Sequence, residues 1–162
     1  MKNKTNRTLR KILSIALCLA LVMSYVPMVS ITASAAATDI TVTIDTGASV
    51  TLRDADGDDY YDIGTADELY AFAAEVNSGN TSINGELTAN IVANENVLAT
   101  DGTLNQGEFR PWTPIGDDSN KYYGTFDGRD HTVSGLYVVC EDWTIIYAGL
   151  FGYVGSGGTV QN

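Results

Sequence analysis

The alternation of apolar and polar positions predicts short strands around a single helix. Residues 40–45 alternate strictly, with Ile40, Val42 and Ile44 apolar, which is typical of a half-buried strand. Residues 50–52 return as a second short strand after a turn. Farther along, apolar segments separated by glycines and by a polar loop at 94–108 indicate more short strands. These later strands are expected at 86–92, 122–126 and 132–139.

Residues 66–77 are expected to form the helix. Thr65 and Glu68 have the spacing of a capping box, in which each side chain accepts a hydrogen bond from the other residue's backbone N–H. Four apolar residues at helical spacing give one stripe that must be buried: Leu69, Phe72, Ala73 and Val76. Asn77, Ser78 and Gly79 end the pattern.

The first 35 residues have the pattern of a signal for export from a bacterial cell. Basic residues up to Lys11 precede an apolar run at 12–29, and small residues at 33–37 fit the cleavage rule. A permanent anchor helix is the alternative, because an 18-residue apolar run is near the minimum that spans a membrane. Pro27 and the alanine-rich exit favour cleavage. The predicted location is therefore secreted or at the bacterial cell surface.

The net charge of the chain limits the classes of partner that it can bind. The chain has 9 Lys or Arg, 20 Asp or Glu and 1 His, a formal charge of −11. Removal of the signal leaves 4 basic against 20 acidic residues, a charge of −16. This negative charge argues against nucleic-acid binding and against adsorption to anionic membranes after cleavage. About 125 mature residues make one domain at most.

Cysteine and histidine offer little chemistry. Cys18 leaves with the signal, so Cys140 has no disulfide partner. It follows an apolar run and is interpreted as a small buried hydrophobe, because a nucleophilic thiol would need a partner and only His131 is present. His131 itself is interpreted as a structural turn residue. No cofactor is expected.

The second half contains a weak internal repeat. Residues 124–127 align with 149–152 at a spacing of 25, and residues 132–134 align with 159–161 at a spacing of 27. Periods in the twenties suggest a solenoid, in which each coil buries its inner face against the next. Two unrelated glycine–phenylalanine turns are the alternative.

Three motifs carry a resemblance to a known family. Residues 112–116 (WTPIG), 123–136 (YGTFDGRDHTVSGL) and 148–154 (AGLFGYV) resemble the GLUG-motif family of secreted and surface bacterial proteins. Residues 63–69 and 87–91 match its usual lead-in, although Asn90 stands where the family carries Asp. The resemblance implies an adhesin-like protein; the family also occurs in non-catalytic regions of IgA-specific zinc peptidases. A zinc peptidase motif is absent here.

The resemblance implies a mainly β fold: the start of a right-handed parallel β-helix, two to three coils long, with one N-terminal capping α-helix. The expected organisation is a signal at 1–35, strands and an acidic turn at 36–62, and the helix plus coils at 63–162. The chain is expected to be a fragment truncated at its C-terminus, or to associate with itself edge to edge. The coil interior is expected to hold Phe126, Val133, Leu136, Leu150, Phe151 and Val160.

Two acidic motifs are candidates for chemistry. Residues 44–49 around Asp45 resemble the Asp-Thr-Gly signature of aspartic proteases, but a second copy is missing, so catalysis would need a homodimer; the alternative is an ordinary turn. Asp54, Asp56 and Asp58 are a candidate weak Ca²⁺ site, since carboxylates at alternate positions suit a hard cation. The alternative is a solvated acidic turn.

The predicted function is a non-enzymatic scaffold or adhesin-type protein that presents a polar, acidic surface to an extracellular ligand. A glycan or a host or matrix protein would be such a ligand, and the aromatic residues, including Trp112 and Trp143, would suit sugar stacking if they are exposed. The alternative is a secreted hydrolase. It would be either the homodimeric protease or a polysaccharide-active β-helix, which would need clustered carboxylates on one outer face.

Overall fold

The structure is a computed structural model that describes residues 37–139 and 147–162. The expected signal or anchor at 1–35 lies outside the described residues, as do Cys18, Cys140 and Trp143. Within the described ranges, none of the helices has both the length and the apolar character needed to cross a membrane.

The N-terminal strands form the expected hairpin. Strand β1 (Ile40–Thr43) pairs antiparallel with β2 (Ser49–Leu52). Val42 and Leu52 point into the core, and the polar residues between them face solvent. Gly47 closes the connecting turn with a positive φ of 81°. The period-two pattern of the sequence is therefore confirmed here.

Helix α2 (Ala66–Asn77) has the expected bounds and the expected cap. The hydroxyl of Thr65 accepts a hydrogen bond from the backbone N–H of Glu68 at 3.2 Å, and the Glu68 carboxylate accepts one from the N–H of Thr65 at 2.9 Å. The apolar stripe is buried against the hairpin and the strands beside it; its members are Leu69, Phe72, Ala73 and Val76.

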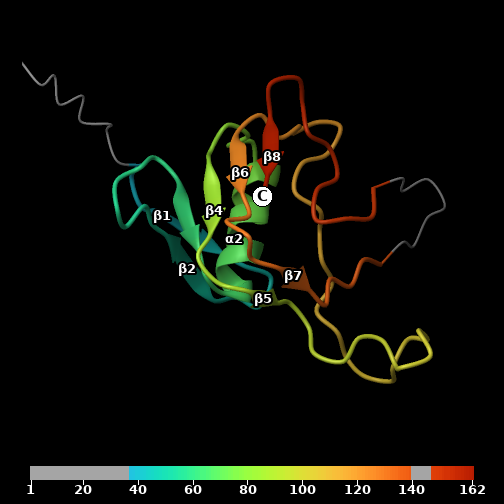
Figure 1. The fold of residues 1–162 in the computed structure, drawn as a ribbon. Helices are drawn as coiled ribbons and strands as arrows, with labels where there is room; N and C mark the ends of the chain where they lie inside the picture. The colour runs from blue at the N-terminus through green and yellow to red at the C-terminus, as the bar shows by residue number, and fades with distance from the viewer. Residues whose placement is uncertain (1–36, 140–146) are drawn as a thin grey trace, which may run out of the picture. The chain divides into compact units, whose positions relative to one another are not determined.

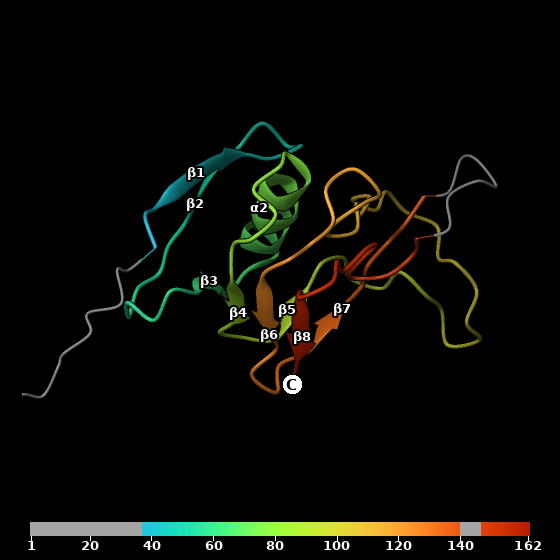
Figure 2. The same ribbon diagram turned by 90° about the horizontal axis from the view of Figure 1, so that it is seen from above.

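The other strands are short and pair in parallel (Figures 1 and 2). Four of them form one sheet in the order β3 (Tyr61–Ile63), β4 (Gly85–Leu87), β6 (Thr125–Asp127), β8 (Thr159–Gln161). Two more form a separate parallel pair, β5 (Ile91–Val92) and β7 (Val133–Ser134).

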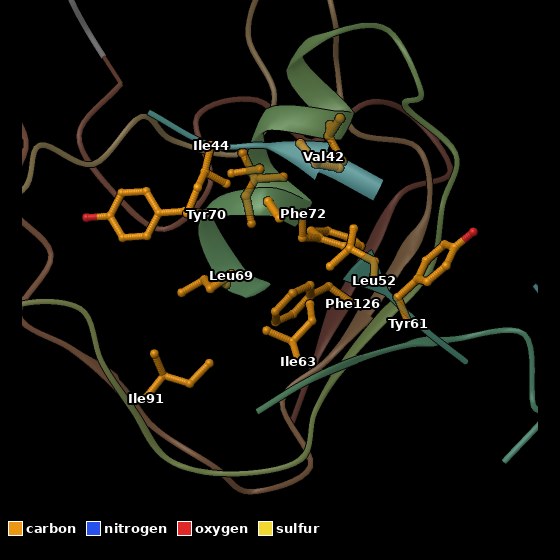
Figure 3. Close-up of a cluster of buried hydrophobic side chains, with 14 of the residues drawn as sticks. Val42, Ile44, Leu52, Tyr61, Ile63, Leu69, Tyr70, Phe72, Ile91 and Phe126 are labelled. Atoms are coloured by element: carbon orange, nitrogen blue, oxygen red, sulfur yellow. The ribbon is translucent and has the colours of Figure 1, made fainter. Parts of the chain in front are cut away.

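Aromatic rings join the helix to the four-stranded sheet (Figure 3). Phe72 meets Phe126 with ring centroids 5.6 Å apart and Tyr122 at 6.1 Å, both edge-on. Phe126 meets Phe151 at 5.2 Å. Edge-on pairs of buried rings add to the stabilisation that burial of their apolar area provides. Phe126 is thus in the core, as expected from the sequence.

The expected fold class, a mainly β fold beginning a parallel β-helix of two to three coils, is wrong. The described residues form a mixed α/β arrangement of separate small sheets, one of them antiparallel, with no closed or solenoid sheet. Residues in register along the largest sheet, Tyr61, Gly85, Phe126 and Val160, are 24, 41 and 34 positions apart. Such unequal intervals do not define the constant repeat that stacked coils require.

The segments that the internal repeat aligns are not the segments that pair in the structure. Phe151 bridges to Ile115, and β8 pairs with β6, so the spacings of 25 and 27 do not describe neighbouring strands. Val160, expected inside, is 50% exposed because β8 is the last strand of its sheet. The single strand expected at 86–92 is divided into β4 and β5.

Gly135 provides a test of how closely two backbones approach. Its φ is +72°, and a Cβ there would overlap the backbone of Asn94. Gly102 has a similar φ of +81° but open space around the Cβ position. We expect Gly135→Ala to lower the free energy of unfolding by about 3 kcal/mol or more, and Gly102→Ala by about 1 kcal/mol. Urea unfolding measures both, and equal losses would contradict the close approach.

Candidate functional site

Three carboxylates from three neighbouring strands lie side by side on the four-stranded sheet. Asp62 of β3 is in register with Glu86 of β4, which is in register with Asp127 of β6. Their sequence neighbours Ile63 and Leu87 are buried on the opposite face. Because side chains alternate along a strand and adjacent strands lie about 4.8 Å apart, these carboxylates form a row on the outer face. We call Asp62, Glu86 and Asp127 the acidic row.

Arg129 neutralises part of the acidic row. Its Nε donates to Glu86 at 2.7 Å, and Nη2 bonds to the same carboxylate oxygen. Nη2 also lies 3.3 Å from Asp58, and Nε lies 3.9 Å from Asp127. The Glu86 side chain is only 8% exposed, so Arg129 provides the charge partner that a buried carboxylate needs. One cation therefore faces several carboxylates, and the row keeps a negative charge.

The environments of Glu86 and Asp127 shift their pKa values in opposite directions. Burial raises the pKa of Glu86, although Arg129 opposes this shift. Hydrogen bonds from the Asn162 side chain, from the backbone of Arg129 and from the Gln161 side chain lower the pKa of Asp127. Both amide groups donate to the Asp127 carboxylate at 2.9 Å. Adjacent carboxyl groups with opposite shifts are the combination that acid–base catalysis uses.

Three grooves formed by described residues lie away from the acidic row. One of about 210 Å³ is lined by residues that include Ile44, Tyr70 and Pro111. Others, of about 250 Å³ and 410 Å³, lie beside Trp112 and beside Val92. The row is therefore not part of any of these three grooves. In chemical terms it is a surface that attracts cations and basic groups.

The candidate calcium residues do come together in the loop at 54–59. Asp54, Asp56 and Asp58 each offer a carboxylate oxygen, and these atoms lie within 4.8 Å of one another. Asp54 already accepts four backbone N–H groups, from Ala37 at 2.9 Å and from three loop residues. Those hydrogen bonds fill its acceptor positions, so Asp54 organises the loop itself.

The charges of this loop affect each other and connect it to the acidic row. Partial burial, together with the charges of Asp56 and Asp54, raises the pKa of Asp58, although Arg129 opposes the shift. Desolvation opposes ionisation of Asp54, but its four backbone donors outweigh that effect and its pKa is lowered. The Ca²⁺ site remains a prediction, with Asp56 as the carboxylate that has fewest protein partners.

Asp45, the protease-like aspartate, is held in an ion pair. Arg110 donates to its carboxylate from Nε at 3.0 Å and from Nη2. The same guanidinium binds Asp67 at 2.7 Å and lies 3.4 Å above the centre of the Tyr70 ring. Hydrogen bonding to Arg110 lowers the pKa of Asp45. A carboxylate held ionised in this way is poorly suited to share a proton with a second aspartate.

The remaining candidates have structural roles in the described part of the chain. The residues after Asp45 form the hairpin turn, with Gly47 N–H donating to Ile44 at 2.8 Å. His131 donates its backbone N–H to Gly128 in the turn after β6. Trp112 is buried and its indole N–H donates to Gly149 at 3.0 Å, so it is not free for sugar stacking.

Sequence reasoning missed the two arginines that organise the acidic groups. Arg110 and Arg129 lie 65 and 43 residues from the Asp45 and Glu86 carboxylates that they bind. A signal was present, because only four basic residues follow the N-terminal segment and each was therefore a candidate for pairing. The partners themselves are not visible in the sequence.

Comparisons with known proteins give two partial similarities. No family model matches the chain, and no solved structure matches it. A stretch of 51 residues, 32% of the chain, is 37% identical to the "Putative Gly-rich membrane protein" of Evansella cellulosilytica. A longer alignment of 139 positions, which covers 80% of the chain, is 34% identical to "Halomucin" of Haloquadratum walsbyi. The chain spans 6% and 2% of the lengths of these two relatives.

The ion pair of Asp45 predicts a specific acid dependence. Its pKa is lowered from the ordinary 3.8, so its contribution to stability is complete above that pH and is lost as the pH falls through the lower folded value. We expect Asp45→Asn to flatten the decline of unfolding free energy below pH 3.8. Glu108→Gln, which removes an exposed carboxylate with no ion pair in the described structure, should leave it unchanged. If the unfolding free energy fell equally with pH in the wild type and in Asp45→Asn, the prediction would be contradicted.

Calcium binding by the 54–59 loop is tested by thermal unfolding. If the loop binds the ion, millimolar Ca²⁺ raises the melting temperature by a few degrees. Asp56→Asn should abolish this rise without lowering stability in the absence of calcium. Asp54→Asn should lower that stability, because Asp54 holds four backbone N–H groups. No shift of the wild-type protein at about 10 mM Ca²⁺ would exclude the site.

Proposed function

We propose that the chain is a secreted or cell-surface, non-enzymatic scaffold or adhesin-type protein of a bacterium, which binds an extracellular ligand through its acidic surface. The observation that carries this proposal is the acidic row, in which Asp62, Glu86 and Asp127 share one outer face of the parallel sheet. The fixed spacing of the strands gives the surface a defined pattern of charge. Such a surface favours ligands with basic groups.

The pairing of the basic residues with carboxylates supports a surface on which acidic groups dominate. Arg53, Arg110 and Arg129 each pair with carboxylates of the same chain, and Lys121 lies 4.4 Å from the centre of the Tyr153 ring. Basic side chains that are paired within the molecule contribute little to the binding of an anionic partner. A ligand that complements the protein therefore carries the opposite charge.

Location outside the cell is supported by three observations of different kinds. The first 35 residues have the basic, apolar and small-residue pattern of an export signal. The names of the two relatives, a membrane protein and a halomucin, agree with the cell surface or its exterior. The motifs at 112–116, 123–136 and 148–154 resemble a family of secreted and surface proteins, independently of the fold which that family implied.

A secreted hydrolase is the second candidate, and one observation favours it. The acidic row meets the requirement for clustered carboxylates on one outer face, and Glu86 and Asp127 have opposite pKa shifts. Arg129 bonds to Glu86, however, and this favours the ionised form of the group that would have to donate a proton. We therefore place binding ahead of hydrolysis.

Variants of the acidic row test the function directly. We expect Asp62→Asn combined with Asp127→Asn to weaken binding of a tetralysine peptide roughly three- to tenfold, because two charges of the row are removed, one on a half-buried and one on a buried side chain. Glu75→Gln combined with Glu108→Gln removes the same charge elsewhere and should change binding less than about twofold. Isothermal titration calorimetry measures both. Equal weakening by the two double variants would show that net charge, rather than the row, determines binding.

An activity assay of the full chain and of Glu86→Gln distinguishes binding from hydrolysis. We expect the full chain to generate no new reducing ends from polysaccharides, whether or not it binds them on a glycan array. Turnover that disappears in Glu86→Gln, with the folded state retained by circular dichroism, would overturn the non-enzymatic assignment and favour the hydrolase.

A further inference from the structure

An apolar groove lies beside β5, on a surface separate from the acidic row. Its volume is about 410 Å³, and its apolar wall contains Val92, Val97, Leu98 and Leu136. Val92 is 47% exposed and Leu98 is 62% exposed. Large apolar side chains gathered in one exposed groove indicate a contact surface more strongly than isolated ones do.

One wall of the groove belongs to a small hairpin within the long connection after β5. Asn105 N–H donates to Val97 at 2.9 Å, Ala99 N–H donates to Thr103 at 2.8 Å, and Leu98 faces Leu104 across the pair. Both leucines are more than half exposed, but of the two only Leu98 lines the groove. The hairpin therefore holds one leucine over the groove and leaves the other outside it.

Asn94 fixes the inner side of the groove. Its amide donates to the carbonyl oxygens of Arg110 at 3.0 Å and Gly135 at 2.9 Å, and its side-chain oxygen accepts from Arg110 N–H at 2.7 Å. These bonds join the segments that border the groove. A groove held in this way is formed before binding, so a ligand does not have to order it.

The backbone of β5 is paired on the side of β7. Ile91 and Ala93 donate to Thr132 and Ser134 of the neighbouring segment. In a parallel pair, alternate residues of a strand face the same neighbour, so the N–H and C=O of Val92 point to the other side. No hydrogen bond to these groups is seen from a described residue. That open edge faces away from β7, whereas the groove lies over the faces of both strands, so an extended peptide in the groove contacts Val92, Ser134 and Leu136 through side chains.

The charges around the groove select the chemistry of the occupant. Glu95 lines it, and the polar loop at 94–108, which contains the hairpin, also carries Asp101 and Glu108 but no basic residue. A second copy of this chain would bring the same carboxylates against these. A peptide with Lys or Arg beside its apolar residues would complement them.

We propose that this groove binds an extended peptide segment of another protein, in which apolar side chains alternate with Lys or Arg. Apolar residues of the segment occupy the space between Val92, Leu98 and Leu136, and its basic residues face Glu95. The inference does not depend on the proposed function, because no residue of the acidic row takes part.

Binding of a labelled peptide, Lys-Val-Lys-Leu-Lys-Val, to the full chain tests the proposal by fluorescence anisotropy. We expect Leu98→Ser to weaken binding about tenfold, because the apolar contact is lost, and Leu104→Ser to change it less than about twofold. Glu95→Gln should weaken binding about threefold, while Glu108→Gln should not. Replacing every Lys of the peptide by Glu, or every apolar residue by Ser, should reduce binding at least about tenfold.

Amide chemical shifts on peptide addition locate the site. Shifts centred on residues 92–98 and 134–136 support the groove, whereas shifts centred on Asp62, Glu86 and Asp127 overturn it and assign the peptide to the acidic row. Equal effects of Leu98→Ser and Leu104→Ser also overturn it. A concentration-dependent dimer in sedimentation that Leu98→Ser abolishes would show a second copy as the occupant instead.

Discussion

The ring of Phe72 meets Phe126 and Tyr122 edge-on and lies over Gly85, where a larger residue would collide with it. This contact holds the helix against strands that are only two to three residues long. So few backbone hydrogen bonds do not stabilise a sheet alone, and the burial of shared apolar surface provides most of the stabilisation. The acidic row keeps its alignment because the opposite face of the sheet is fixed in this way.

The parts of the fold that the sequence predicted depend on neighbouring residues. Thr65 and Glu68 define the start of α2 within four positions, and alternation defines β1 and β2. The pairing of distant segments was not predictable in the same way. Gly124-Phe126 and Gly149-Phe151 look alike as strings, yet the first lies in β6 beside β8 and the second bridges to Ile115, because register depends on which core positions remain to be filled.

The same limit applies to the candidate site. The alternate spacing of Asp54, Asp56 and Asp58 suggested a cation site, and their carboxylate oxygens do lie within 4.8 Å of one another. It did not show that Asp54 would be surrounded by backbone N–H groups or that Asp58 would face Arg129, a residue 71 positions away. Likewise Asp45 had the surroundings of a catalytic motif in the sequence, and its ion pair with Arg110 comes entirely from tertiary structure.

The described residues include 18 carboxylates and 4 basic side chains, and all three arginines are paired within the molecule. The mutual repulsion of the remaining acids is therefore left to mobile cations in the surrounding water. In dilute solution that repulsion acts over tens of ångströms, whereas at about 0.1 M it is screened within about 10 Å. Dissolved salt therefore reduces the electrostatic self-repulsion that opposes the folded state of this chain.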